Sequence, residues 1–146
     1  MNTDANSKTI VFSIKMLYYG FRASTGVVTP LPMNIPIPID LRIATMSYIA
    51  NIIDTSHVKK SLNEIAEIIM RSYKNTQEAW NIVARTSQIP PLHIDSIIWP
   101  LLNIARENNY NYQRTLSSSV KFFLKVWKDL DKETLLDILT IVFRRL

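Results

Sequence analysis

The sequence predicts an all-α protein, folded as a bundle of about six helices. Only 2 of its 146 residues are glycine, which argues against glycine-rich phosphate loops and hairpin-rich β architecture. Elsewhere apolar residues recur at three- and four-residue spacing, the period of a helix with one buried face. A chain of this length with 47% hydrophobic residues can bury one core, so we expect a single helical domain over residues 1–146.

Capping residues and prolines divide this periodic pattern into segments. Ser7, Asp40 and Asp131 each precede an apolar periodic run, as N-cap residues do, and Asn75-Thr76-Gln77-Glu78 resembles a capping box. Four prolines between residues 30 and 38 predict a stiff extended connector, and Pro100 should bend or break its helix. The expected helical segments are 8–23, 41–53, 57–73, 76–86, one opening at 90–91, 116–130 and 132–145.

The composition excludes several classes of protein. Without cysteine there is no disulfide framework and no thiolate metal site, which fits a cytoplasmic protein. A charge or proline interrupts every apolar run before bilayer-spanning length, so we expect no membrane segment. His57 and His93 lack a nearby carboxylate cluster, and we expect no metal and no cofactor. A net charge of +5 favours, without requiring, a nucleic acid partner.

Lys8, Phe12 and Lys15 lie on one face of the first expected helix. Their spacing of four and three residues places an aromatic ring between two amines. A lysine amine attacks an electrophile only when it is neutral, and a neighbouring cation such as Lys15 favours the neutral form. Lys8 is therefore a candidate nucleophile. Alternatively, both lysines are solvated on an exposed helix edge while Phe12 packs inward.

Two carboxylates are further candidates. Asp40 follows the proline-rich connector and either caps a helix or contributes a charge to a site. Asp95 and Trp99 are four residues apart, so a carboxylate and a large ring emerge from one helix surface, where they can hydrogen-bond and stack on a base. The alternative is a surface aspartate above a core tryptophan.

Three sequence motifs together resemble the archaeal GO glycosylase family of 8-oxoguanine DNA glycosylase/lyases. They are KTIVFSIK at residues 8–15, IPIPIDLR at 35–42 and IPPLHIDSIIW at 89–99, and the resemblance extends from about residue 7 to 105. Because the three occur in the same order, they are much more specific than any one of them. The resemblance implies an all-helical member of the helix-hairpin-helix glycosylase superfamily that acts on DNA containing 8-oxoguanine.

The resemblance also implies a role for each candidate residue. Lys8 would attack C1′ of the deoxyribose, and the resulting Schiff base would allow β-elimination to cut the strand. The charge of Asp40 would stabilise the developing oxocarbenium sugar and help proton transfers.

The remaining candidates would bind the flipped base. Phe12 and Trp99 would stack on its two faces, Asp95 would hydrogen-bond its edge, and Lys15 would line the same pocket.

The family carries a further helical region before its catalytic lysine. Only seven residues precede Lys8, so we expect this region to be absent here. The chain is then a glycosylase/lyase, active alone or with a separate polypeptide that supplies the missing part, or a non-catalytic DNA-binding fragment. An unrelated protein–protein module would require all three motif matches to be chance.

Overall fold

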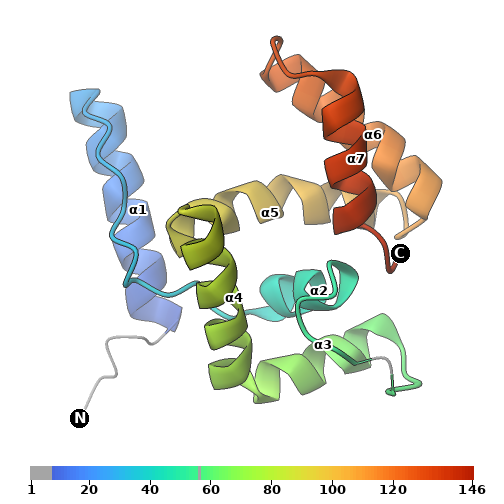
Figure 1. Cartoon of the computed structure of the whole chain (residues 1–146). Helices are drawn as coiled ribbons and strands as arrows, with labels where there is room; N and C mark the ends of the chain where they lie inside the picture. The colour runs from blue at the N-terminus through green and yellow to red at the C-terminus, as the bar shows by residue number, and fades with distance from the viewer. Residues whose placement is uncertain (1–7, 56) are drawn as a thin grey trace.

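The protein is helical throughout the part that the structure describes. The computed structural model describes residues 8–55 and 57–146, and these contain seven helices and no strand (Figure 1). The all-α prediction is confirmed, while the cap expected at Ser7 lies outside the described residues. The helices are α1 (Lys8–Thr25), α2 (Leu41–Ile49), α3 (Leu62–Arg71), α4 (Tyr73–Ser87), α5 (Pro91–Glu107), α6 (Tyr112–Val126) and α7 (Lys132–Val142).

Helix α2 lies at the centre of the packing. It contacts α3 on one side and α5 on another, and six of its nine residues are buried. Removing this apolar surface from water is the main stabilising contribution, at roughly 25 cal/mol per Å². The main core joins α2 to the helices after it and contains Ile37, Ile43, Met46, Ile49, Trp80, Ile98, Leu101, Leu102, Val120, Phe123, Leu135, Leu139 and Phe143.

A hydrogen bond inside this core fixes α4 against α2. The indole Nε1–H of Trp80 donates to Ser47 Oγ over 2.8 Å, and the Ser47 hydroxyl donates to the Ile43 carbonyl over 2.7 Å. Both side chains are buried, so the polar groups gain partners that water cannot supply there. Trp80 therefore has a structural role.

Helix α1 lies at one side of the molecule and packs far less tightly than the other helices (Figure 1). Only Val11 and Lys15 of its residues are buried. Val11 forms a small cluster with Leu31 of the connector and Leu92 of α5. The connector between α1 and α2 runs back along α1 before it enters the core at Ile37, whose carbonyl accepts a hydrogen bond from Gln77 over 3.3 Å.

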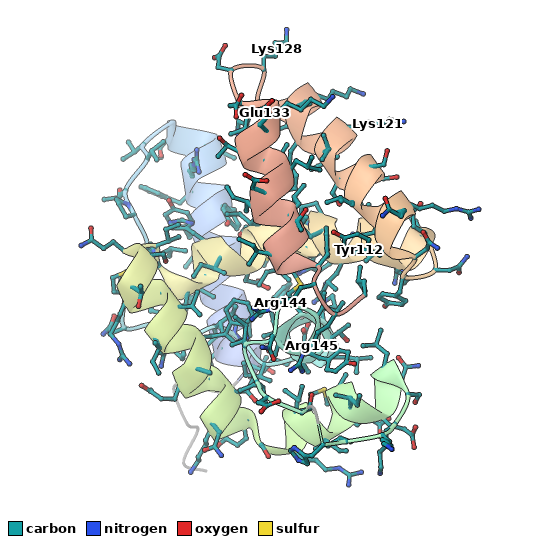
Figure 2. The ribbon with its side chains drawn as sticks, turned by 45° about the vertical axis from the view of Figure 1, so that its right-hand side comes forward. Tyr112, Lys121, Lys128, Glu133, Arg144 and Arg145 are labelled. Carbon is teal, nitrogen blue, oxygen red and sulfur yellow. The ribbon has the colours of Figure 1, made fainter. Side chains whose placement is uncertain are left out.

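Helices α6 and α7 form an antiparallel pair over the other end of α5 (Figure 1). Figure 2 shows Lys121 and Lys128 on the outside of this pair, with Arg144 and Arg145 just beyond the end of α7. The Arg144 Nη2 donates to the Ala50 carbonyl over 3.3 Å, and Arg145 lies over the ring of Tyr48 with Cζ 5.4 Å from the centroid. These contacts of Arg144 and Arg145 therefore hold the end of α7 against the end of α2.

Several expected helix boundaries are wrong. Helix α3 begins at Leu62 because Ser61 and Glu64 form a capping box, where the sequence pattern placed the start near residue 57. The capping box expected at residues 75–78 does not form, since α4 begins at Tyr73 and Thr76 is buried at the α3–α4 junction. The Thr76 hydroxyl instead donates hydrogen bonds to the carbonyls of Ile69 and Ser72, over 3.2 and 3.3 Å.

Two other helix ends and one expected helix break also differ from the prediction. Helix α2 stops at Ile49, because Asn51 takes a left-handed conformation with φ of 55°. Asn111 caps α6, which starts at Tyr112 rather than at residue 116. Helix α5 continues through Pro100, so the break that this proline allowed does not occur.

In the described part of the chain, no helix combines the length and the apolar character needed to cross a membrane.

We expect Trp80→Phe to lower the free energy of unfolding by about 2 kcal/mol, because it removes a buried hydrogen-bond donor and leaves a small cavity. Urea denaturation followed by circular dichroism measures this. Trp127→Phe is the matched control, since Trp127 is 49% exposed, and its effect should stay below about 0.5 kcal/mol. Equal effects of the two substitutions would contradict the role of the Trp80–Ser47 hydrogen bond.

Candidate active site

A cavity of about 220 Å³ opens where α1, the connector and the starts of α2 and α5 meet. Four of the six predicted site residues line it. Lys15 and Trp99 do not, although each contacts a residue that does. The lining residues are Lys8, Phe12, Pro38, Asp40, Arg42 and Asp95.

Asp40 caps α2 and is held by four hydrogen bonds. Its Oδ1 accepts from the backbone amides of Arg42 and Ile43, each over 3.0 Å. Its Oδ2 accepts from Arg42 Nε over 3.0 Å and Arg42 Nη2 over 2.6 Å. The amides at a helix start favour a negative charge, so the local fold keeps a carboxylate at the cavity wall.

The residue that sequence reasoning missed is Arg42. Its guanidinium binds Asp40 on one side, and its Cζ lies 3.7 Å from the centroid of the Trp99 ring. This is cation–π geometry, and it links α2 to α5 beside the cavity that Arg42 lines. The available signal was its place two residues after a capping aspartate, where a long side chain can fold back onto the cap.

Lys15 and Asp95 form a buried ion pair between α1 and α5. The Lys15 Nζ donates to Asp95 Oδ2, and their side chains are only 7% and 6% exposed. Burial raises the pKa of Asp95, and the hydrogen bond and charge of Lys15 oppose that rise. Within the described residues Asp95 Oδ1 accepts no hydrogen bond, so it can accept one from a bound molecule.

Lys15 contacts other groups than the sequence suggested. It is paired with Asp95 and lies 5.9 Å from the centroid of the Tyr19 ring. Its positive charge is therefore largely compensated, which weakens its expected effect on Lys8.

Lys8 is the first residue of α1, and its exposed side chain lines the cavity. No acidic residue lies in the first turn of that helix.

A second layer of contacts holds α1 against α5. Tyr19 and Ser96 share a hydrogen bond between their hydroxyls. His93 Nε2 accepts from the Leu31 amide over 3.3 Å. Burial, followed by the charges of Arg22 and Lys15, lowers the pKa of His93, which fits the neutral ring that this acceptor role requires. Among the described residues no three histidine, aspartate or glutamate side chains gather as metal ligands would.

A lysine at a helix start, a capping carboxylate and an exposed aromatic ring line one cavity, and sites for amine-based covalent catalysis are built from groups of these types. The family model described as "AGOG: N-glycosylase/DNA lyase" matches residues 1–133, which is most of the chain. The chain therefore belongs to the AGOG family of N-glycosylase/DNA lyases, and the resemblance drawn from its three motifs is confirmed.

Individual relatives agree with this assignment. The chain is 41% identical over 92 residues to an N-glycosylase/DNA lyase of Pyrobaculum aerophilum, covering 63% of this chain and 32% of that one. It is 35% identical over 129 residues to one of Methanococcus maripaludis, covering 86% and 41%.

A solved structure is also similar. It is the 8-oxoguanine DNA glycosylase of Pyrobaculum aerophilum in complex with 8-oxoguanosine, with a TM-score of 0.58 and 39% identity. The similarity covers 66% of this chain and 35% of that one. The chain thus spans only about a third to two fifths of the length of these relatives.

We expect Lys15→Met to lower the free energy of unfolding by about 3 kcal/mol, because it leaves the buried Asp95 without a partner. The double variant Lys15→Met/Asp95→Leu should recover most of that loss, since an apolar pair of similar size needs no partner. Urea titration of the variants measures both changes. An additive loss in the double variant would show that the two residues contribute independently.

Proposed function

We propose that this chain removes 8-oxoguanine from DNA and cleaves the strand, with Lys8 as the nucleophile. The observation that carries the proposal is the shared cavity, which brings a lysine amine, two carboxylates and an aromatic ring together from three separate motifs. Membership of the AGOG family and the bound 8-oxoguanosine of the similar structure support the choice of substrate.

The proposed reaction begins when the neutral amine of Lys8 attacks C1′ of the damaged nucleotide. The bond between C1′ and the base nitrogen breaks, and the base leaves with its electron pair and takes up a proton. Asp40 lies on the same cavity, so its negative charge stabilises the positive charge that develops on the sugar. Ring opening then gives a Schiff base between Lys8 and C1′.

The lyase step follows from the Schiff base. The iminium makes the C2′ hydrogen acidic, and a base removes it. The electrons of that C–H bond form the C2′–C3′ double bond as the C3′–O bond breaks and the 3′ phosphate leaves. In this proposal Asp40, which lines the same cavity, accepts or relays that proton.

The same cavity supplies contacts for a flipped base. Phe12 is exposed on the cavity wall and offers one stacking face, and Trp99 on α5 would offer the other. The unpaired Oδ1 of Asp95 would accept a hydrogen bond from an N–H at the base edge. Such stacking, worth about 1–3 kcal/mol per base, offsets the unstacking of the nucleotide from the duplex.

We also propose that a helical part of the family, beyond the third matched here, packs on α1. The outer face of α1 exposes a row of apolar side chains, with Leu17 at 75% and Phe21 at 56% of their full accessible area. Apolar patches of this kind mark interaction surfaces. This part is either linked to the chain or supplied by a separate polypeptide.

Borohydride trapping on a duplex with one 8-oxoguanine tests the catalytic proposal. The chain should form a covalent adduct, Lys8→Gln should form none, and Asp40→Asn should form it about a hundredfold more slowly. Lys121→Gln on the remote α6 is the matched control and should react like the unaltered chain. An adduct that persists in Lys8→Gln would exclude Lys8 as the nucleophile.

Complementation tests the proposed partner of α1. Adding the remaining two thirds of a relative as a separate polypeptide should accelerate adduct formation, and Leu17→Asp/Phe21→Asp should abolish the gain. Ile138→Asp on α7 places the same charge at another exposed apolar residue and should leave the gain intact. Should neither the chain nor the mixture form an adduct while both are folded, the chain is a non-catalytic fragment.

A further inference from the structure

Arg42 lines the cavity and covers one face of the Trp99 ring. Trp99 itself does not line the cavity, and the Arg42 Cζ lies 3.7 Å from the centroid of its ring. The planar cation therefore occupies a stacking face of Trp99. A flipped base cannot stack directly on that face while Arg42 remains there.

The same guanidinium masks Asp40. Two of the four hydrogen bonds to the carboxylate come from Nε and Nη2 of Arg42, and both reach Oδ2. With the two amides on Oδ1, every strong acceptor position of Asp40 is occupied. A carboxylate paired this way has its charge compensated by the guanidinium and both of its oxygens engaged in hydrogen bonds.

We infer that Arg42 is a gate, which the oxidised base displaces from Trp99 on entering the cavity. This inference rests on the proposed function and adds a step to it. Displacement exposes the stacking face of Trp99 and frees Oδ2 of Asp40 together, because one side chain covers both. The site thus gains its stacking surface and its uncompensated negative charge only when a base is bound.

The surroundings of Arg42 allow this movement. Its side chain is 37% exposed, whereas that of Asp40 is 11% exposed, so the arginine is the member of the pair that can leave. Arg42 also lines a second cavity of about 210 Å³, together with Leu41, Thr45, Asn63, Leu102, Asn103, Arg106 and Tyr110. This second cavity offers space for the displaced guanidinium.

Binding of the nucleoside 8-oxo-2′-deoxyguanosine tests the gate without any chemical step. In a Trp127→Phe background, Trp80 stays buried, so quenching of tryptophan fluorescence reports on Trp99. Arg42→Ala should lower the dissociation constant about three- to tenfold, because the base no longer competes with a cation–π contact. Arg42→Gln, which keeps a polar side chain at this helix start, should also bind more tightly.

Chemical rescue separates a gate from a structural role. Ethylguanidinium should fill the vacated position in Arg42→Ala and restore the weaker affinity, whereas ethylammonium at the same ionic strength should not. Arg85→Ala removes another exposed arginine, on α4, and should change neither affinity nor its response to the additives.

The outcomes keep this inference apart from the proposed function. Affinity in Arg42→Ala that is unchanged or weaker would overturn the gate, even if borohydride trapping supports Lys8. Tighter binding that ethylguanidinium reverses would support the gate, even if no adduct forms. If neither protein binds the nucleoside, the gate and the recognition of oxidised guanine are both overturned.

Discussion

The ion pair between Lys15 and Asp95 is the contact on which the candidate site depends. Helix α1 carries Lys8 and Phe12 but buries few side chains of its own, so apolar packing does little to fix its position. A buried pair fixes it more closely, because each charge is costly to leave without its partner. The Tyr19–Ser96 hydrogen bond one turn further along α1 acts between the same two helices. These two contacts therefore hold the Lys8 amine of α1 in a fixed position relative to the Asp95 carboxylate of α5.

The capping and catalytic interpretations of Asp40 are compatible. Caps stabilise a helix by about 1 kcal/mol through hydrogen bonds to free amides, and the same amides fix a charge in position. Ile37 anchors the connector in the core three residues earlier, so the carboxylate cannot move far from the cavity. One rigid element thereby supplies stability and, in the proposed mechanism, a preorganised negative charge.

The periodic pattern predicted the helices, and the three motifs with the family resemblance predicted four of the residues around the cavity. Contacts between residues far apart in the sequence were not predicted. The period of the apolar residues predicted the helices, but Thr76 lies inside α4 because a junction with α3 buries it, which no local pattern shows. The pairing of Lys15 with Asp95 joins residues eighty positions apart, so spacing on one helix suggested a different neighbour. Arg42 was overlooked because its position on Trp99 depends on how α2 crosses α5.

The two unusual surfaces of this chain have a common physical origin. Helix α1 exposes apolar residues, and the cavity beside it is lined in part by the partly exposed side chain of Arg42. Both are expected when a site lies at the edge of a packed unit and not inside it. A partner helix on α1 would lower the local dielectric, which strengthens the attraction between Asp40 and a positively charged sugar. The same change would strengthen the pairing of Arg42 with Asp40, so a more enclosed site would depend more strongly on displacement of the arginine by the base.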